Sequence, residues 1–206
     1  MNVTDFDAWR ERYDTMTYKE MKDFYNLVEV DHPLQQAYNA DAFGRFLDYV
    51  IEAVGPITVL EIGGWKGELA CGMLGRQSII KWYNYEICEA AVQKSICALP
   101  RYKPIIPDDF VWNIELPSAN VLIASHFIEH IRWWELVLLI RRLPRSISFI
   151  GLQSPLGASG KDWAGYLGTH IIEARWQDIC DFLFVKDFVD LQLLGDGDFK
   201  AFWQAA

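Results

Sequence analysis

The pattern of apolar and polar residues changes near residue 55 of the chain. Before this point, apolar residues recur every three or four positions, as they do along one face of an α-helix. One such face, just before Gly55, carries five apolar residues: Phe43, Phe46, Leu47, Val50 and Val54. We therefore expect residues 1–54 to form an N-terminal helical extension. Thr17 is expected to cap its first helix in a capping box with Glu20, and Asn39 to cap the second.

After residue 55, short apolar runs alternate with helical segments. Strands are expected at 58–62, 79–87, 103–107, 120–125 and 146–152. Helices are expected at 67–75, 89–98, 132–143 and 174–183. Segments 188–194 and 199–203, separated by Gly-Asp-Gly-Asp, are typical of a closing hairpin. The alternation predicts an α/β domain over residues 55–206, with a mostly parallel sheet and helices on both faces.

Composition narrows the class of partner. The 206 residues are 51% hydrophobic and carry a formal net charge of −9, which suits a small molecule or a neutral partner better than nucleic acid. No apolar run approaches the ~20 residues that span a bilayer, and the charged N-terminus does not resemble a signal peptide. The four cysteines form no C-x-x-C pair. We expect a cytoplasmic protein with neither a metal site nor membrane association, and a homodimer stays open.

The chemistry centres on the stretch L-E-I-G-G-W-K-G-E-L at residues 60–69, which follows a predicted strand and opens a helix. A phosphate-binding loop of the Walker type requires Lys after its last glycine, whereas Lys66 precedes Gly67. The dinucleotide fingerprint G-x-G-x-x-G, started at Gly63, meets Trp65 and Glu68 where glycines belong. Both motifs fail, and an NAD-linked oxidoreductase is disfavoured.

A third interpretation needs fewer glycines. Glu61 precedes the loop, and Glu86 ends the second strand, where a carboxylate can accept the hydroxyl groups of a ribose. The loop itself, Gly63-Gly64-Trp65-Lys66-Gly67, would then face an amino-acid tail instead of a pyrophosphate. This arrangement predicts a nucleoside ligand that carries an amino acid.

These motifs resemble those of the class I S-adenosylmethionine-dependent methyltransferases, over roughly residues 50–206. V-L-E-I-G-G-W-K-G-E looks like their first motif, Y-N-Y-E-I like the strand that ends in the ribose-binding acid, and N-V-L-I-A-S-H-F-I-E-H-I like their fourth-strand motif. The resemblance implies a seven-stranded Rossmann-like sheet with an antiparallel C-terminal strand and S-adenosylmethionine as cofactor. It also implies adenine contacts from Asp108 and Asp109, and places Ser125 and His126 beside the sulfonium.

This chain departs from the family pattern E-x-G-x-G-x-G in the middle of the loop. Trp65 stands where the second of the three glycines is usual, directly after Gly64. The cofactor's amino-acid tail is therefore expected to be contacted differently, with Lys66 available for its carboxylate.

His126-Phe127-Ile128-Glu129-His130 also matches H-x-x-E-H, a zinc-peptidase signature in which two His on one helical face bind the metal. The zinc-hydrolase interpretation is the weaker one, because His126 directly follows a buried-strand pattern and need not share a helical face with His130.

The methyl acceptor is expected to be a small molecule. An oxygen acceptor, as in sugar O-methylation, needs a base, and His126 and His170 are the candidates. Glu129 and His130, which open the next helix, are catalytic candidates as well as plausible structural residues. The aromatic N-terminal helices are candidates for a lid. The non-enzymatic alternative is a binding or assembly protein that has this fold but no catalytic activity.

Overall fold

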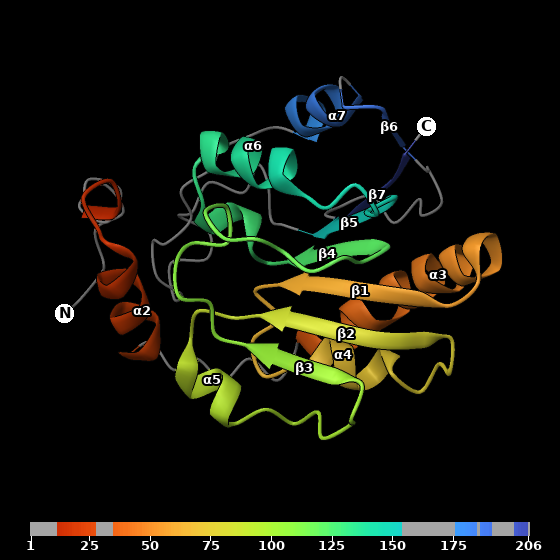
Figure 1. Ribbon diagram of the computed structural model, residues 1–206, viewed down its shortest axis with the longest axis horizontal. Helices are drawn as coiled ribbons and strands as arrows, with labels where there is room; N and C mark the ends of the chain where they lie inside the picture. The colour runs from red at the N-terminus through yellow and green to blue at the C-terminus, as the bar shows by residue number, and fades with distance from the viewer. Residues whose placement is uncertain (1–11, 28–34, 154–175, 185, 191–199, 206) are drawn as a thin grey trace.

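A seven-stranded sheet organises the part of the chain that the computed structural model describes, residues 12–27, 35–153, 176–184, 186–190 and 200–205 (Figure 1). The strands are β1 (Ile57–Ile62), β2 (Ile79–Tyr85), β3 (Tyr102–Ile105), β4 (Val121–Ser125), β5 (Phe149–Gln153), β6 (Phe188–Asp190) and β7 (Lys200–Ala205). They lie in the order β3-β2-β1-β4-β5-β7-β6. β1 to β5 pair in parallel, and β7 runs antiparallel to β5 and β6. The predicted mostly parallel sheet with an antiparallel C-terminal strand is confirmed.

Two helices precede β1, and the other described helices come after strands. They are α2 (Tyr18–Leu27), α3 (Gln35–Val54), α4 (Glu68–Met73), α5 (Glu89–Gln93), the short 3-10 helix η1 (Ile128–His130), α6 (Trp133–Arg142) and α7 (Trp176–Phe184). The Thr17–Glu20 capping box is confirmed, because the Thr17 amide donates to the Glu20 carboxylate at 2.8 Å and the Glu20 amide to the Thr17 hydroxyl at 3.3 Å. No described helix has both the length and the apolar character needed to cross a membrane.

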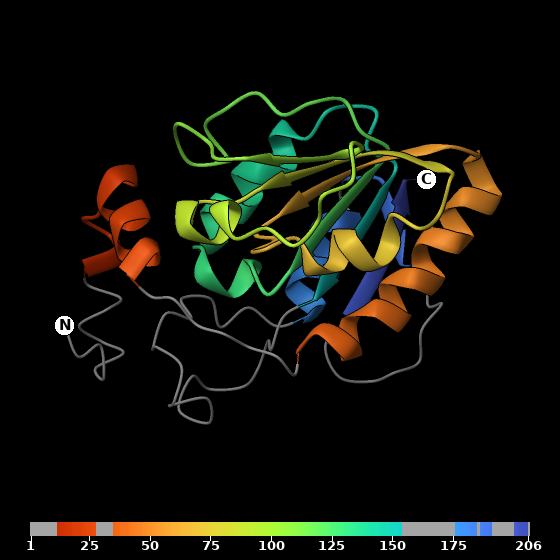
Figure 2. The same cartoon turned by 90° about the horizontal axis from the view of Figure 1, so that it is seen from below.

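Two separate apolar layers flank the sheet. Val59 of β1 packs in one layer with Phe46 of α3 and residues of α4, whereas its neighbour Leu60 packs in the other with Leu136 of α6 and residues of α7. Successive side chains of a strand point to opposite faces. α3 and α4 therefore cover one face and α6 and α7 the other (Figures 1 and 2).

α3 thus contributes directly to the core of the sheet, although the sequence pattern assigns it to an N-terminal extension. Its Phe43 and Phe46 both contact the ring of Phe202 in β7. The division of the chain into 1–54 and 55–206 stays a prediction.

Several predicted boundaries are wrong. α3 begins at Gln35 instead of just after Asn39, because Gln35, Gln36 and Ala37 are good helix formers and extend it toward the N-terminus. β5 begins at Phe149 and not at residue 146, and it extends one residue further than expected. The closing Gly-Asp-Gly-Asp turn lies outside the described residues.

The helix expected at 89–98 ends at Gln93, where the chain turns to dock on the glycine-rich loop. The Ile96 amide and the Ser95 hydroxyl both donate to the Lys66 carbonyl, at 3.0 and 3.1 Å. Tertiary hydrogen bonds therefore override the helical pattern in this segment.

The contact between α3 and β5 depends on Gly151, and this gives a test of the fold. A Cβ at Gly151 would lie 3.0–3.1 Å from ring carbons of Phe43, Phe46 and Phe202. Gly151→Ala should therefore destabilise the protein by about 1–3 kcal/mol through overpacking, measured by urea unfolding. The control is Gly72→Ala in α4, where an added Cβ meets nothing within 4 Å. It should stabilise by about 0.5–1 kcal/mol. Equal effects of the two substitutions would contradict this packing.

Candidate active site

The predicted site residues that the structure describes gather at the carboxyl edge of the sheet, where β1 and β4 are neighbours. The order of the strands along the chain reverses between these two, and ligands of open α/β sheets bind at such a switch point. The loop after β1 touches the segment after β4, since a Cβ added at Gly63 would lie 3.0 Å from the Cβ of Phe127. The structure therefore brings the first and fourth predicted motifs together.

Three glycines of the loop are required by space and by backbone conformation. Gly63 and Gly67 have φ of 73° and 79°, in the left-handed region. A Cβ at Gly64 would overlap the Glu61 carboxyl group, and one at Gly67 would overlap the Tyr102 hydroxyl group. Trp65 also has a left-handed φ, of 48°, although it is not a glycine. Trp65, which replaces the second glycine of the family pattern, thus keeps the left-handed backbone conformation that glycine usually adopts.

Amides of the loop donate hydrogen bonds within the protein. The Gly63 amide donates to the Tyr85 carbonyl at 2.8 Å, and the Gly67 amide to the Gly64 carbonyl at 2.8 Å. The Gly64 amide donates to Asn84 Oδ1 at 3.0 Å, and the Trp65 amide to Glu86 Oε2 at 2.9 Å. A pyrophosphate site presents a row of free amides to the anion. This loop does not, which agrees with the failure of both phosphate motifs in the sequence.

Two carboxyl groups are buried beneath the loop. Glu61, 1% exposed, accepts a hydrogen bond from Trp82 Nε1 at 2.7 Å, and burial raises its pKa to about 8. Glu86, 4% exposed, lies directly after β2, and burial raises its pKa to about 7. Backbone amides moderate the rise in the pKa of Glu86, including that of Cys88, which donates at 2.8 Å. Glu61 therefore packs against Gly64 of the loop. Glu86 links the loop to the end of β2 through the Trp65 amide.

The two aspartates after β3 differ in their surroundings. Asp109 accepts hydrogen bonds from the Phe110 amide at 2.7 Å and from Asn113 Nδ2 at 3.2 Å, so it organises its own turn. Asp108 is exposed. The turn presents Phe110, whose ring stacks on Trp112 with centroids 4.7 Å apart.

After β4, Ser125 and His126 of the predicted motif contact Gln153, a residue that the sequence analysis does not include among the site residues. The Ser125 hydroxyl donates to Gln153 Oε1 at 3.1 Å, and His126 Nε2 lies 3.2 Å from Gln153 Nε2. His126 has a left-handed φ of 55°, which turns the chain out of the strand. Gln153 at the end of β5 thus holds both Ser125 and His126.

The zinc interpretation has no helix to support it. Residues Ile128–His130 form only the 3-10 helix η1, and His126 lies before it. The His130 ring makes an edge-to-face contact with Tyr25 of α2, 6.2 Å between centroids, whereas His126 contacts Gln153. Among the described residues, no group of His, Cys, Asp and Glu has the arrangement of a metal site. The side chain of Glu129 and the whole of His170 lie outside the part of the chain that can be described.

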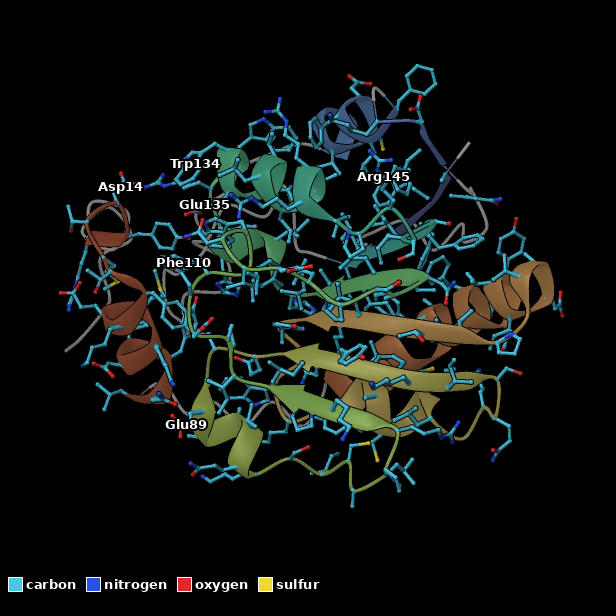
Figure 3. The ribbon with its side chains drawn as sticks, viewed as in Figure 1. Asp14, Glu89, Phe110, Trp134, Glu135 and Arg145 are labelled. Atoms are coloured by element: carbon cyan, nitrogen blue, oxygen red, sulfur yellow. The ribbon has the colours of Figure 1, made fainter. Side chains whose placement is uncertain are left out.

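Helix α2 lies across the carboxyl edge of the sheet (Figure 1). Its Asn26 side chain accepts from the Ala90 amide at 3.0 Å, and the Tyr25 carbonyl accepts from the Cys88 thiol at 3.3 Å. The Tyr18 hydroxyl donates to the Pro107 carbonyl. In Figure 3, Glu89, Phe110 and Glu135 mark the three neighbouring segments that face this helix. The segment before α2 also reaches α6, where the Tyr13 hydroxyl donates to Glu135 at 2.7 Å.

The raised pKa of Glu61 makes stability depend on pH. The folded protein holds the proton up to about pH 8, whereas an unfolded glutamic acid releases it near pH ~4.3. The stabilisation is complete below the unfolded pKa and is lost as the pH rises through the folded one. The melting temperature should therefore fall between pH 5 and pH 9. Glu61→Gln keeps an acceptor for Trp82 and should reduce this slope to the part that the raised pKa of Glu86 contributes; an unchanged slope would contradict the assignment.

Comparison with known proteins adds evidence on the fold. No protein-family model and no curated protein sequence matches the chain. Solved structures do match. Magnesium protoporphyrin IX methyltransferase (ChlM) from Synechocystis PCC 6803 with bound SAM has a TM-score of 0.63 at 12% identity, over 90% of this chain and 94% of that one.

Two further matches have the same fold within longer chains. CalO1, a methyltransferase in calicheamicin biosynthesis solved in an SAH-bound form, has a TM-score of 0.56 at 14% identity, over 84% of this chain and 61% of that one. The mitomycin 7-O-methyltransferase MmcR has a TM-score of 0.59 at 16% identity, over 93% of this chain and 61% of that one. This chain thus spans about three fifths of each of these two proteins. The chain has the Rossmann-like fold of the class I S-adenosylmethionine-dependent methyltransferases.

Proposed function

We propose that this protein is an S-adenosylmethionine-dependent methyltransferase that acts on an oxygen atom of a small molecule. The observation that carries the proposal is the junction of β1 and β2, where the glycine loop is bound through the Trp65 amide to Glu86. This junction supports a nucleoside ligand whose ribose meets Glu86 and whose amino-acid tail lies along Gly63–Gly67.

The acceptor sites of Glu86 and the direction of the loop amides fit this cofactor better than a dinucleotide. An ionised carboxylate has about four acceptor sites, and the Trp65 and Cys88 amides occupy two of those on Glu86. Ribose hydroxyl groups can take the other sites. The inward-facing loop amides disfavour a pyrophosphate. Glu61 and the loop are proposed to orient the amino-acid tail, with Lys66 near its carboxylate.

The other strand ends supply the rest of the proposed site. Asp108 and Asp109, in the turn after β3, are proposed for the adenine end. Ser125 and His126, held by Gln153, are proposed beside the reacting centre. S-adenosylmethionine supplies an activated methyl group on its sulfonium. His126 is proposed to take the proton from the acceptor hydroxyl on Nε2, which exchanges its contact with Gln153 Nε2 for the acceptor, and the 7-O-methyltransferase among the structural matches supports oxygen as the acceptor atom.

We further propose that α2 is the lid of this site. It bonds to the segments after β2 and β3, which are the proposed ribose and adenine sides. Burial and the nearby Asp108 raise the pKa of the Tyr18 hydroxyl to about 12, and the protonated hydroxyl donates to the Pro107 carbonyl. Bound cofactor should slow amide hydrogen exchange in Tyr18–Leu27; exchange that does not change would contradict a lid.

Calorimetry with S-adenosylmethionine tests the cofactor site. The wild-type protein should bind, and Glu86→Ala should weaken binding at least about tenfold, because a hydrogen bond to a charged group contributes about 1.5–3 kcal/mol. The control is Glu52→Ala, since Glu52 is an exposed residue of α3; its affinity should equal that of the wild type. Wild-type protein that does not bind the cofactor would overturn the proposal and favour a binding or assembly role.

Substitution of His126 tests the catalytic assignment. Transfer of a labelled methyl group to a panel of sugars and phenols should identify an acceptor. His126→Ala should then lower kcat by about 10²-fold or more, as expected for loss of a general base, and change the Kd for S-adenosylmethionine less than twofold. Unchanged turnover in this variant would remove His126 as the base and leave His170 to be tested in the same way.

A further inference from the structure

Two consecutive amides of the glycine loop are held by side chains that stand two residues apart at the end of β2. The Gly64 amide donates to Asn84 at 3.0 Å and the Trp65 amide to Glu86 at 2.9 Å. Residues two apart in an extended segment point to the same face. The end of β2 therefore presents one acceptor to each of these two amides from the same face.

The loop needs this support because of Trp65. A residue with a Cβ in the left-handed region costs about 1–2 kcal/mol relative to glycine, and such a conformation persists only when its surroundings impose it. Trp65 has a φ of 48° at the position where the family pattern has glycine. The Trp65 amide donates to Glu86 and the Trp65 carbonyl accepts from Asn84 Nδ2 at 3.4 Å, so the peptide groups on both sides of the Trp65 Cα are held in the turn.

Asn84 is itself held in one orientation. It is fully buried, and its Oδ1 must be the atom that faces the Gly64 amide, because an amide NH₂ group cannot accept that bond. Its Nδ2 then donates to the Tyr102 hydroxyl at 2.8 Å. A second donation, to the Trp65 carbonyl, is longer at 3.4 Å. Rotation of the Asn84 amide would break these bonds together.

Tyr102 connects the two ends of the loop. Its hydroxyl accepts from Asn84, which holds Gly64, and also packs against Gly67, where no Cβ would fit. Because Tyr102 belongs to β3 and Asn84 to β2, the loop after β1 is positioned by two strands that lie beyond it in the sheet.

We propose that Asn84 is a positioning residue, oriented by Tyr102, that holds the glycine loop in the conformation which receives the amino-acid tail of the cofactor. The proposal rests on the proposed function. It adds a role for Asn84, which lies within Y-N-Y-E-I but has no role in that motif, and for Tyr102, which lies outside the motifs that resemble the methyltransferase family.

The chain offers matched controls for both residues. Asn120 Oδ1 accepts the Thr58 amide at 2.9 Å at the opposite end of β1, and the Tyr49 hydroxyl donates to Gln204 at 3.0 Å away from the loop. Asn120→Ala and Tyr49→Phe therefore remove equivalent hydrogen bonds without touching the site. They report the loss of stability that any such substitution causes.

Calorimetry with S-adenosylmethionine and thermal unfolding should be run on both pairs of variants. Asn84→Ala should raise the Kd at least about tenfold. Tyr102→Phe should raise it about threefold, because Asn84 keeps its bond to Gly64. Asn120→Ala and Tyr49→Phe should lower the melting temperature by similar amounts and keep the wild-type Kd. Tyr102→Phe keeps the proposal testable if Asn84→Ala does not fold.

Amide hydrogen exchange by NMR gives a readout that does not require the cofactor. In Asn84→Ala the Gly64 and Trp65 amides should exchange at least about tenfold faster than in Asn120→Ala. A Kd and exchange rates equal to those of the control would overturn the positioning role. Fast exchange in a wild-type protein that fails to bind S-adenosylmethionine would overturn both this role and the proposed function. Slow wild-type exchange that Asn84→Ala accelerates, without cofactor binding, would overturn the proposed function alone.

Discussion

The hydrogen bond from the Trp65 amide to the Glu86 carboxylate joins the ends of two neighbouring strands. It depends on the parallel pairing of β1 with β2, which brings Ile62 opposite Tyr85 and so sets the glycine loop beside the acid. The conformation of the loop, the burial of Glu86 and the position of the segment after β2 all follow from this contact. Helix α2 in turn packs on that segment through Cys88 and Ala90.

Two acids buried at one edge would be unfavourable without such contacts. Removal of a carboxylate from water costs several kcal/mol unless hydrogen bonds replace the solvent. Glu86 accepts hydrogen bonds from backbone amides, which compensate for the water that its carboxylate loses on burial. Glu61 accepts a hydrogen bond from the Trp82 indole and has the more strongly raised pKa. This difference suits two roles: Glu86 as an acceptor for a ligand, and Glu61 as an uncharged support for the loop near neutral pH.

The sequence predicted the order of the main strands and helices because buried strands and amphipathic helices leave strong local patterns. It also placed Gly63, Glu86 and His126 at strand ends, which the parallel topology then brings to one edge. It missed Asn84 and Gln153, because a single polar residue within or just after an apolar strand has no period of its own. The signal that the sequence offered for Asn84 was its position as a polar residue within an apolar strand.

Other errors have the same origin in long-range contacts. The end of α5 at Gln93 depends on bonds from Ser95 and Ile96 to Lys66, a residue far away in the sequence. The failure of H-x-x-E-H as a metal motif depends on the left-handed turn at His126, which follows from its contact with β5. Local pattern carries no information about either contact.

The central claim is that the carboxyl ends of β1 and β2 bind an adenosyl amino acid. Titration of ¹⁵N-labelled protein with S-adenosylhomocysteine tests it most directly. The account predicts that the largest amide shift changes occur at Gly63–Gly67, at Ile87 and Cys88, and in the turn that contains Asp108 and Phe110. Shift changes confined to other parts of the protein, or none at millimolar ligand, would contradict it.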